Sequence, residues 1–343
     1  MPVYQVEAYV EKAIRSILSQ TYPHFEFLIV NDGTKDKSGE ICDRLALEDT
    51  RITVIHKHNE GAPIARNTAM DIAQGKYYYF MDSDDWVEPT MLEDMVRIAE
   101  ENQSELVISG FYIDTYYSDT EYLTTDYIHK SIVYKNREEF RKMAYRLFDR
   151  NLLYSPWNKL WLRSYVEENQ IRFPQTFWDD FPFILSVIRD VSHVAVTNRQ
   201  YYHFIRARAE SETAKYRPEM YQKREEEHQW MLELYQHWCI FDVESMEMIH
   251  RRYIERLIGC MENVTNPNSI LSTKEKKQLI RKMLNKPHVQ ESLQIMKPRS
   301  FMMKVMLVPI RIKSVGMTYL MCQYISAVKV KNVEKFARLK ASR

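Results

Sequence analysis

The sequence predicts an α/β fold with a mostly parallel sheet flanked by helices, followed by a helical C-terminal region. In residues 2–110, short apolar runs typical of buried strands alternate with amphipathic helical patterns about every 20–25 residues. Two of these runs end in polar turns, at residues 31–33 and 82–85. Ligands bind at the carboxyl ends of the strands in such sheets, so we expect both turns to face one crevice.

The expected elements follow one another in a regular order. The helices comprise residues 6–18, 38–47, 62–73 and 89–102, and the strands comprise residues 25–30, 52–55, 77–80 and 106–113. Ser38 is the expected N-cap of the second helix, and Gly75 is the expected end of the third. Residues 112–134 are rich in Tyr, Thr and Asp, which predicts a surface excursion over the crevice.

The second half of the chain has mainly helical patterns. Helices are expected over residues 137–150 and 219–285, with breaks near Asp242 and at residues 266–268. Aromatic segments lie between these two regions and contain Trp157, Trp161 and Trp178. We expect these rings in the core, with stacking on a ring of a ligand as the alternative.

Charge is unevenly distributed along the chain, whose formal net charge is +1. Residues 297–343 contain eleven Lys or Arg but one acid, Glu334, so the rest of the chain is acidic. This distribution differs from the basic domain of a nucleic-acid-binding protein. In residues 297–325 an apolar stripe is flanked by cations, which suits a helix in the interface of an anionic membrane. A helix packed on the protein body is the alternative.

The four cysteines show no metal-ligand spacing, and we expect each to be a small buried hydrophobe. The sequence shows no leader pattern and no apolar run of the ~18 residues that a membrane span needs. We therefore expect a cytoplasmic protein, peripheral on the cytoplasmic face of the membrane.

An acidic turn follows the aromatic run at residues 77–80. It places three carboxylates, Asp82, Asp84 and Asp85, within four residues. Like charges at this spacing repel unless a positive group lies among them, and a hard divalent cation prefers such oxygen ligands. The alternative is a solvated turn that caps the helix after it. The position of the turn at a strand end favours the functional interpretation.

Six motifs occur in order over residues 2–110. They are Pro2-Val3-Tyr4, Ser19-Gln20-Thr21-Tyr22, Val30-Asn31-Asp32-Gly33, Asn59-Glu60-Gly61 with Ala65-Arg66-Asn67, Gly75-Lys76-Tyr77, and Asp82-Ser83-Asp84-Asp85. Together they resemble the inverting family 2 glycosyltransferases of the GT-A fold, particularly bacterial polysaccharide and cell-wall sugar transferases. A second, less specific match runs through Asn158-Lys159-Leu160, Asp179-Asp180 and Arg206-x-Arg208-x-x-Ser211.

The resemblance implies a nucleotide-sugar site in the first half of the chain. The residues it assigns to substrate binding there are Pro2, Val3, Tyr4, Asp32, Asn59, Arg66, Asp82 and Ser83. Asp32 would accept a hydrogen bond from the uracil ring, and Arg66 would reach the base or a phosphate. The alternatives are a plain turn residue for Asp32 and a surface cation on an alanine-rich helix for Arg66.

The resemblance also implies a metal at the acidic turn. Asp84 would hold Mn²⁺ or Mg²⁺ against the diphosphate, and Asp82 would contact the metal or the ribose. A bound cation neutralises the charge that develops on a nucleoside diphosphate leaving group without any proton transfer. Asp85 would orient the loop or cap the next helix.

Inversion requires a base on the face opposite the leaving group, and the resemblance places it in an acidic pair that opens a helix. Here the pair is Asp179-Asp180. Asp180 is the expected base, which deprotonates an acceptor hydroxyl. Asp179 would support it, although Asp is one methylene shorter than the Glu that the family places there. Simple capping of the helix is the alternative.

Three further cations complete the expected site. Lys159 would help to close it, and Arg206 and Arg208 would pair with the diphosphate or with an anionic acceptor. His203 lies in an aromatic run and is the expected exception, a satisfied core histidine.

One departure from the family pattern concerns its first strand, an apolar run directly before Pro2-Val3-Tyr4, which the sequence lacks. We favour numbering that begins at an internal Met of a longer protein, because every later motif is intact. A damaged copy is the alternative. The expected domains are a GT-A domain at residues 1–215, with a nucleotide-sugar half (1–110) and an acceptor half (111–215), a helical region (216–296) and a basic amphipathic tail (297–343).

The expected function is metal-dependent, inverting transfer of a sugar from a UDP-sugar to a saccharide acceptor carried on a lipid, in capsule, exopolysaccharide or cell-wall glycan synthesis. A catalytically inactive homologue that binds a nucleotide-sugar or a partner transferase is the main alternative. A nucleotidyltransferase is a third interpretation, but its Gly-rich phosphate loop has no counterpart in the sequence.

Overall fold

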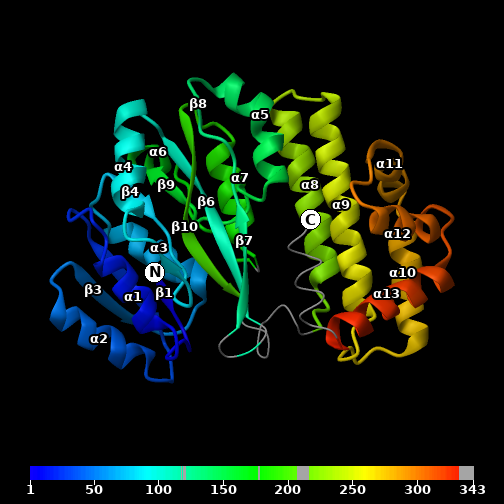
Figure 1. Cartoon of the computed structure of the whole chain (residues 1–343), viewed down its shortest axis with the longest axis horizontal. Helices are drawn as coiled ribbons and strands as arrows, with labels where there is room; N and C mark the ends of the chain where they lie inside the picture. The colour runs from blue at the N-terminus through cyan, green and yellow to red at the C-terminus, as the bar shows by residue number, and fades with distance from the viewer. Residues whose placement is uncertain (117, 119–120, 177, 207–215, 332–343) are drawn as a thin grey trace. The chain divides into compact units, whose positions relative to one another are not determined.

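The computed structural model of the chain describes residues 1–116, 118, 121–176, 178–206 and 216–331 (Figure 1). It divides into two compact units. Unit 1 comprises Met1–Asp114 and Thr124–Arg206, and unit 2 comprises Thr115–Leu123 and Ala207–Arg343.

Unit 1 begins with a three-stranded parallel sheet in the order β1-β2-β3. Its strands are β1 (Pro2–Val3), β2 (Phe27–Asp32) and β3 (Ile52–Lys57). The predicted parallel sheet is thereby confirmed, and the motif at residues 2–3 is itself a short strand, which the sequence did not predict. Both β2 and β3 end in polar residues, and Asp32 is the register partner of Lys57.

Three helices follow the strands of this sheet in sequence: α1 (Val10–Leu18), α2 (Ser38–Glu48) and α3 (Ala62–Ile72). α3 contacts β1 and β2, and α2 contacts β2 and β3. Apolar side chains at helical spacing on α1, such as Val10, Ile14 and Ile17, are buried, because one face of an amphipathic helix must be removed from water.

The second sheet of unit 1 has seven strands, with the central path β4-β9-β6-β10-β5, β7 beside β6 and β8 beside β10. The strands are β4 (Tyr77–Tyr79), β5 (Trp86–Val87), β6 (Leu106–Tyr116), β7 (Tyr122–Tyr127), β8 (Ile132–Tyr134), β9 (Lys159–Leu162) and β10 (Val194–Arg206). Four of its pairs are antiparallel: β4–β9, β6–β9, β5–β10 and β8–β10. The sequence did not predict this antiparallel part. The expected surface excursion over residues 112–134 is wrong, because much of this stretch forms β6, β7 and β8.

The remaining helices of unit 1 are α4 (Met91–Asn102), α5 (Arg137–Asp149), α6 (Arg163–Glu168) and α7 (Asp180–Ile188). Two predicted helix ends are wrong. The Ser38 hydroxyl does not cap α2 but accepts a hydrogen bond from the Val6 backbone N–H at 3.0 Å. α3 ends at Ile72 rather than at Gly75, whose N–H donates to the Glu26 carboxylate at 2.7 Å. In both cases a tertiary hydrogen bond takes the group that the sequence pattern assigned to the helix.

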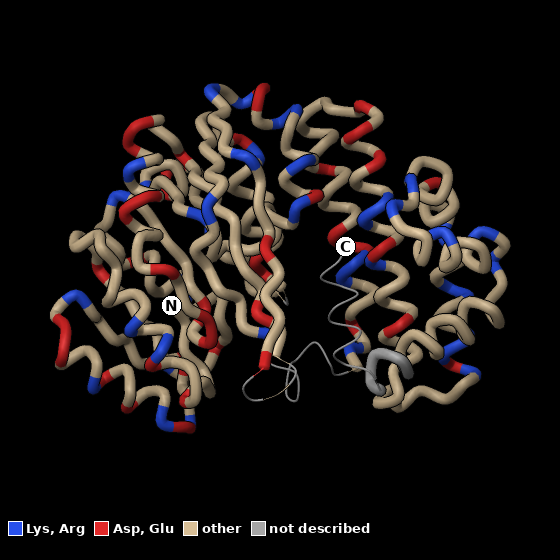
Figure 2. Tube along the Cα trace, viewed as in Figure 1, with Lys and Arg blue, Asp and Glu red and all other residues tan. Residues whose placement is uncertain are grey.

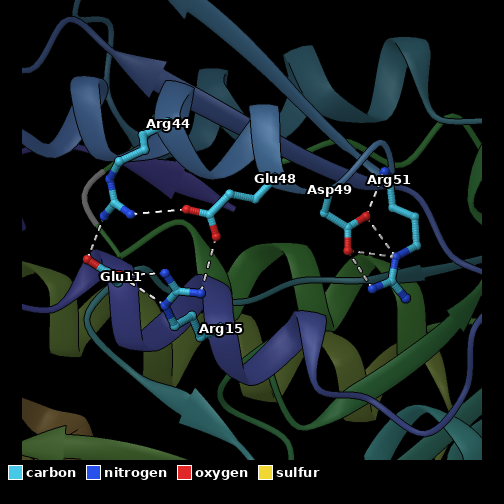
Figure 3. A network of polar contacts seen from close by, with 6 residues as sticks. All are labelled: Glu11, Arg15, Arg44, Glu48, Asp49 and Arg51. Atoms are coloured by element: carbon cyan, nitrogen blue, oxygen red, sulfur yellow. Dashed lines mark hydrogen bonds and ion pairs between the residues drawn. The ribbon is translucent and has the colours of Figure 1, made fainter.

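Exposed ion pairs connect α1 with α2 (Figure 3). The residues drawn are Glu11, Arg15, Arg44, Glu48, Asp49 and Arg51. Arg44 reaches Glu11 at 2.7 Å and Glu48 at 3.2 Å, with nearly half of each side chain in water. Exposed pairs of this kind contribute about 0–1 kcal/mol each. The buried apolar faces of the two helices therefore supply most of the packing free energy.

Unit 2 is mainly helical. Its helices are α8 (Met220–His237), α9 (Val243–Val264), α10 (Thr273–Leu284), α11 (Pro287–Ile295), α12 (Phe301–Arg311) and α13 (Val315–Lys331). The predicted breaks near Asp242 and at residues 266–268 are confirmed, since Asp242 caps α9 through the Ser245 N–H. Side chains from α9 to α13 share one apolar core. Among the described residues, no helix is both long and apolar enough to cross a membrane.

Three of the four cysteines are buried hydrophobes, as expected. Cys239 is the exception: it is exposed and has a φ of 55°, just after the end of α8. The sequence pattern placed it in a helix, but α8 ends at His237 and Cys239 has the left-handed backbone that is common just after a helix end.

Candidate active site

The candidate site of unit 1 is organised around the guanidinium of Arg66 on α3. It contacts Asp82, which follows β4, at 2.7 Å, and Asp179 and Asp180 at the start of α7 at 2.9 and 3.2 Å. The Arg66 side chain is 6% exposed, so the surface-cation alternative is wrong. Residues more than a hundred positions apart in sequence thus meet around one buried cation.

Burial alone would lower the pKa of Arg66, but the charges of Asp180, Asp82 and Asp179 raise it above its ordinary value. Arg66 is therefore permanently charged. Partial burial raises the pKa of Asp180 to about 7, and the charges of Asp82 and Asp179 add to this effect, whereas Arg66 opposes it. A carboxylate with a pKa near the working pH can both accept and release a proton.

The geometry at the start of α7 does not match the capping alternative for the acidic pair. Asp179 is the N-cap residue, and its side chain makes no capping hydrogen bond. Its Oδ2 instead accepts from Arg66, while Oδ1 of Asp180 is ion-paired with Arg66 but makes no hydrogen bond. The side chain of Asp180 is one-third exposed. The two carboxylates therefore pair with Arg66 and do not cap the helix.

Lys159 on β9 is fully buried, so a free surface charge is excluded. Its Nζ donates to the Ser155 carbonyl and to Oδ1 of Asn158, both at 2.6 Å. Burial lowers the pKa of Lys159 well below its ordinary value, and the charge of Asp180 counteracts this. Lys159 is therefore an interior side chain that is held by Ser155 and Asn158, and an electrostatic interaction links it to Asp180.

The acidic turn is fixed to β10 by Asp85, which is buried. Its carboxylate accepts the Tyr202 hydroxyl at 2.6 Å and the Ile205 N–H at 2.7 Å. The Tyr202 oxygen in turn accepts the Asp82 N–H at 3.2 Å. Asp85 thus orients the loop, and the capping role is excluded because Thr90 is the N-cap of α4. Nothing in the sequence singled out Tyr202.

The hydroxyl of Tyr202 leads to a stability prediction. Tyr202→Phe is expected to lower the free energy of unfolding by about 1.5–3 kcal/mol, because a buried carboxylate loses a donor. Tyr201→Phe is the matched control, since its hydroxyl donates to the more exposed Asp94 at 2.8 Å. Urea denaturation of both variants measures the difference, and equal losses would contradict the role of Tyr202.

The carboxylate of Asp84 is available for a ligand. Asp84 is exposed, and no other described residue gives its side chain a hydrogen bond or an ion pair. Across the described residues, no group of three His, Cys, Asp or Glu side chains is arranged to hold a metal. A Mg²⁺-type ion commonly takes only one or two carboxylates, with water and substrate phosphates as the other ligands. Asp82 and Asp84 supply two carboxylates of this kind, although one oxygen of Asp82 accepts from Arg66.

Asp32 at the end of β2 has a larger role than a turn residue. Its Oδ1 accepts from Lys57 Nζ and from the Glu60 N–H, both at 3.0 Å, and its Oδ2 accepts from the Gly61 N–H at 2.8 Å. It therefore ties the end of β2 to the loop after β3. Lys57 was missed from the sequence, although a polar residue at the end of a neighbouring parallel strand was a usable signal.

The other predicted donor-site residues differ in exposure. Val3 is fully buried in β1, Tyr4 is 43% exposed, and Ser83 is buried in the acidic turn. Asn59 is exposed in the loop after β3, where its backbone nitrogen would lie 2.8 Å from a Cβ added to Gly33. Among the described residues, no hydrogen bond or ion pair joins Asn59 to the Arg66 cluster, which consists of Arg66, Asp82, Asp179 and Asp180.

Arg206 ends β10, and burial lowers its pKa. Arg208 lies outside the described residues. His203 is satisfied as predicted, between Asp114 at 2.9 Å and Glu88 at 3.1 Å.

Two of the three tryptophans belong to the core, as expected. Trp161 is fully buried, and Trp157 is 5% exposed and stacks on Tyr202 with ring centroids 4.2 Å apart. Sugar stacking by these two rings is therefore excluded in this structure.

The chain is similar to known proteins in sequence and in fold. Residues 1–169 match the family model described as glycosyl transferase family 2. The uncharacterized glycosyltransferase EpsJ of Bacillus subtilis is 29% identical over 298 residues, which cover 85% of this chain and 84% of EpsJ. The putative teichuronic acid biosynthesis glycosyltransferase TuaG of the same organism is 35% identical over 111 residues, or 32% of this chain and 44% of TuaG.

Among solved structures, the TarS fragment 1–349 of S. aureus in complex with UDP-GlcNAc has a TM-score of 0.63 at 16% identity. The match covers 94% of this chain and 89% of that one, and at this identity it shows the fold alone. Residues 1–169 of the chain therefore belong to glycosyl transferase family 2, and the structural similarity shows that the fold is that of the GT-A transferases.

Proposed function

We propose that the chain is an inverting glycosyltransferase that moves a sugar from a UDP-sugar to a saccharide acceptor. The observation that carries the proposal is the Arg66 cluster, which joins Asp82 on the donor side to Asp180 on α7. An inverting displacement needs a base for the acceptor hydroxyl and groups that hold the donor, and Asp180, with a pKa of about 7, and Asp82 are the candidates for these two roles.

UDP is the proposed nucleotide because of Asp32. Its two oxygens accept three donors, and a carboxylate offers about four lone-pair sites, so one remains for the uracil ring N–H. The S. aureus TarS fragment binds UDP-GlcNAc and UDP, which supports the same nucleotide here. Pro2, Val3 and Tyr4 would line the pocket of the base and ribose.

Asp84, with Asp82, is proposed to hold Mn²⁺ or Mg²⁺. The ion would neutralise the charge of the departing diphosphate. Asp82 also shares Arg66 with Asp180, so the position of the donor and the position of the base depend on one guanidinium. Arg66 thereby orients the base relative to the donor.

The proposed acceptor is a saccharide carried on a lipid, in the synthesis of a bacterial surface glycan. TuaG is named for teichuronic acid biosynthesis, and this supports the class of product rather than its identity. Asp180 would take the proton of the acceptor hydroxyl as the bond to the sugar carbon forms. Asp179 holds Arg66 in place at 2.9 Å.

Donor hydrolysis with the purified chain tests the proposal. UDP-, GDP-, dTDP- and CDP-sugars are incubated with Mn²⁺, with and without EDTA, and nucleotide release is measured. Release of UDP from one donor, with an inverted anomeric centre in the NMR spectrum of the product, is the expected result. Nucleotide-sugar binding without turnover on any donor or acceptor would favour the inactive homologue instead.

A further inference from the structure

Helix α12 in unit 2 has two apolar faces. One packs into the core through Met306, Leu307 and Ile310. The other is exposed and comprises Phe301 (81%), Val305 (39%), Val308 (54%) and Ile312 (63%). These four positions follow the spacing i, i+4, i+7 and i+11, which places them on one side of the helix. A helix that only supported the core would have a polar outer face.

Helix α13 packs against α12 and repeats this feature. Its exposed apolar residues are Met317 (48%), Leu320 (63%) and Tyr324 (71%), at the spacing i, i+3 and i+7. Tyr319 and Cys322 on the same helix are buried in the core. We call the exposed residues of the two helices the outer apolar stripes. Large apolar side chains gathered in this way on a surface mark an interaction site.

The charged residues of α12 and of the turn after it have a single sign. Lys304, Arg311 and Lys313 are exposed, and no described residue forms an ion pair with them. No acidic residue occurs between Glu291 and Glu334 in the sequence. In Figure 2 this stretch of unit 2 accordingly carries basic but no acidic positions.

We propose that the outer apolar stripes dock on the surface of an anionic lipid bilayer. No described helix could span the bilayer, so the contact is that of a helix lying in the interface. Exposed apolar side chains enter the boundary between headgroups and acyl chains, and the flanking cations meet anionic headgroups. A protein partner would have to be both apolar and acidic, whereas an anionic membrane supplies both properties everywhere along its surface.

The docking itself is independent of the proposed function. Its consequence for catalysis rests on that function, because a chain on the membrane and an acceptor carried on a lipid diffuse along the same surface. Retained donor hydrolysis without membrane binding would overturn only the docking, and membrane binding without turnover would overturn only the transferase.

Co-sedimentation of the full chain with vesicles tests the docking. We expect binding to phosphatidylcholine vesicles that contain about one-third phosphatidylglycerol, and at least tenfold weaker binding to pure phosphatidylcholine. The triple variant F301S/V308S/I312S is expected to lose at least tenfold in affinity for the anionic vesicles. The triple variant K304Q/R311Q/K313Q is expected to lose a similar factor and most of the salt dependence.

The matched control is F241S/I270S, which removes two exposed apolar residues of the same unit (65% and 92% exposed) outside α12 and α13. Circular dichroism confirms folding of every variant. Unchanged binding in F301S/V308S/I312S, or an equal loss in the control, would overturn the proposal. Wild-type dimers that dissociate in F301S/V308S/I312S, with no vesicle binding, would assign the stripes to a second copy of the chain.

Discussion

Replacing Asp180 with Asn is expected to lower the rate of sugar transfer by about 10²–10⁴-fold, the usual contribution of a general base. The amide keeps the shape of the side chain but cannot take the proton of an acceptor hydroxyl. Affinity for the nucleotide-sugar should change little, because Asp82 and Asp32 remain in place. Transfer kinetics and donor titration, measured on the same preparation, separate the two effects.

The pKa of Asp180 also predicts a pH profile for the wild-type enzyme. Because this pKa is raised to about 7, the carboxylate is protonated and inactive as a base below that pH. kcat/KM should therefore rise about tenfold per pH unit up to pH 7 and level off above it. Asp71→Asn, on the exposed side of α3, is the control, with 64% of its side chain in water. A flat profile, or transfer within tenfold of wild type in Asp180→Asn, would contradict the assignment.

The sequence predicts where several candidate site residues lie, because these motif residues lie at strand ends. Asp32 is the last residue of β2 in the parallel sheet, and the acidic turn at residues 82–85 follows the apolar run that contains β4, which pairs antiparallel with β9. A strand period and a polar turn are local properties, so a sequence records them directly. The helical part of unit 2 was predictable for the same reason.

The contacts that join these residues were not predictable. Arg66 was expected at the base or a phosphate, and the structure places it between Asp82 and the pair on α7, far away in sequence. Tyr202 appeared to be one aromatic among many, although its hydroxyl fixes the acidic turn. The periodicity of a sequence does not indicate that the Tyr202 hydroxyl will contact the carboxylate of Asp85, 117 residues away.

The antiparallel sheet could not be predicted from the sequence for a related reason. Residues 112–134 have a polar, Tyr-rich composition that resembles a loop, because their strands alternate between a packed and a solvated face. Tyr122–Tyr127 illustrates this pattern, with exposed and half-buried residues in strict alternation. Pairing with β6 and β10, rather than local propensity, makes these segments strands.

Asp84→Asn is expected to abolish metal-supported turnover, with at least a hundredfold loss at the Mn²⁺ concentration that saturates the wild type. In the proposed site the amide loses the negative charge that holds the cation against the diphosphate. The free energy of unfolding should stay within about 0.5 kcal/mol of wild type, because the Asp84 side chain has no partner among the described residues. Turnover against Mn²⁺ concentration and urea denaturation measure the two quantities.

Asp82→Asn provides the contrast that makes this prediction specific. Asp82 contacts Arg66 at 2.7 Å, so its replacement should lower the free energy of unfolding as well as turnover, since it removes a charge from a buried ion-pair cluster. Asp43→Asn, an exposed carboxylate on α2 with 54% of its side chain in water, should change neither quantity much. Turnover that survives both EDTA and Asp84→Asn would assign the neutralisation of the leaving group to protein cations instead. If Asp84→Asn loses turnover at unchanged stability, and Asp82→Asn loses both, then Asp84 serves the ligand alone, whereas Asp82 also stabilises the fold.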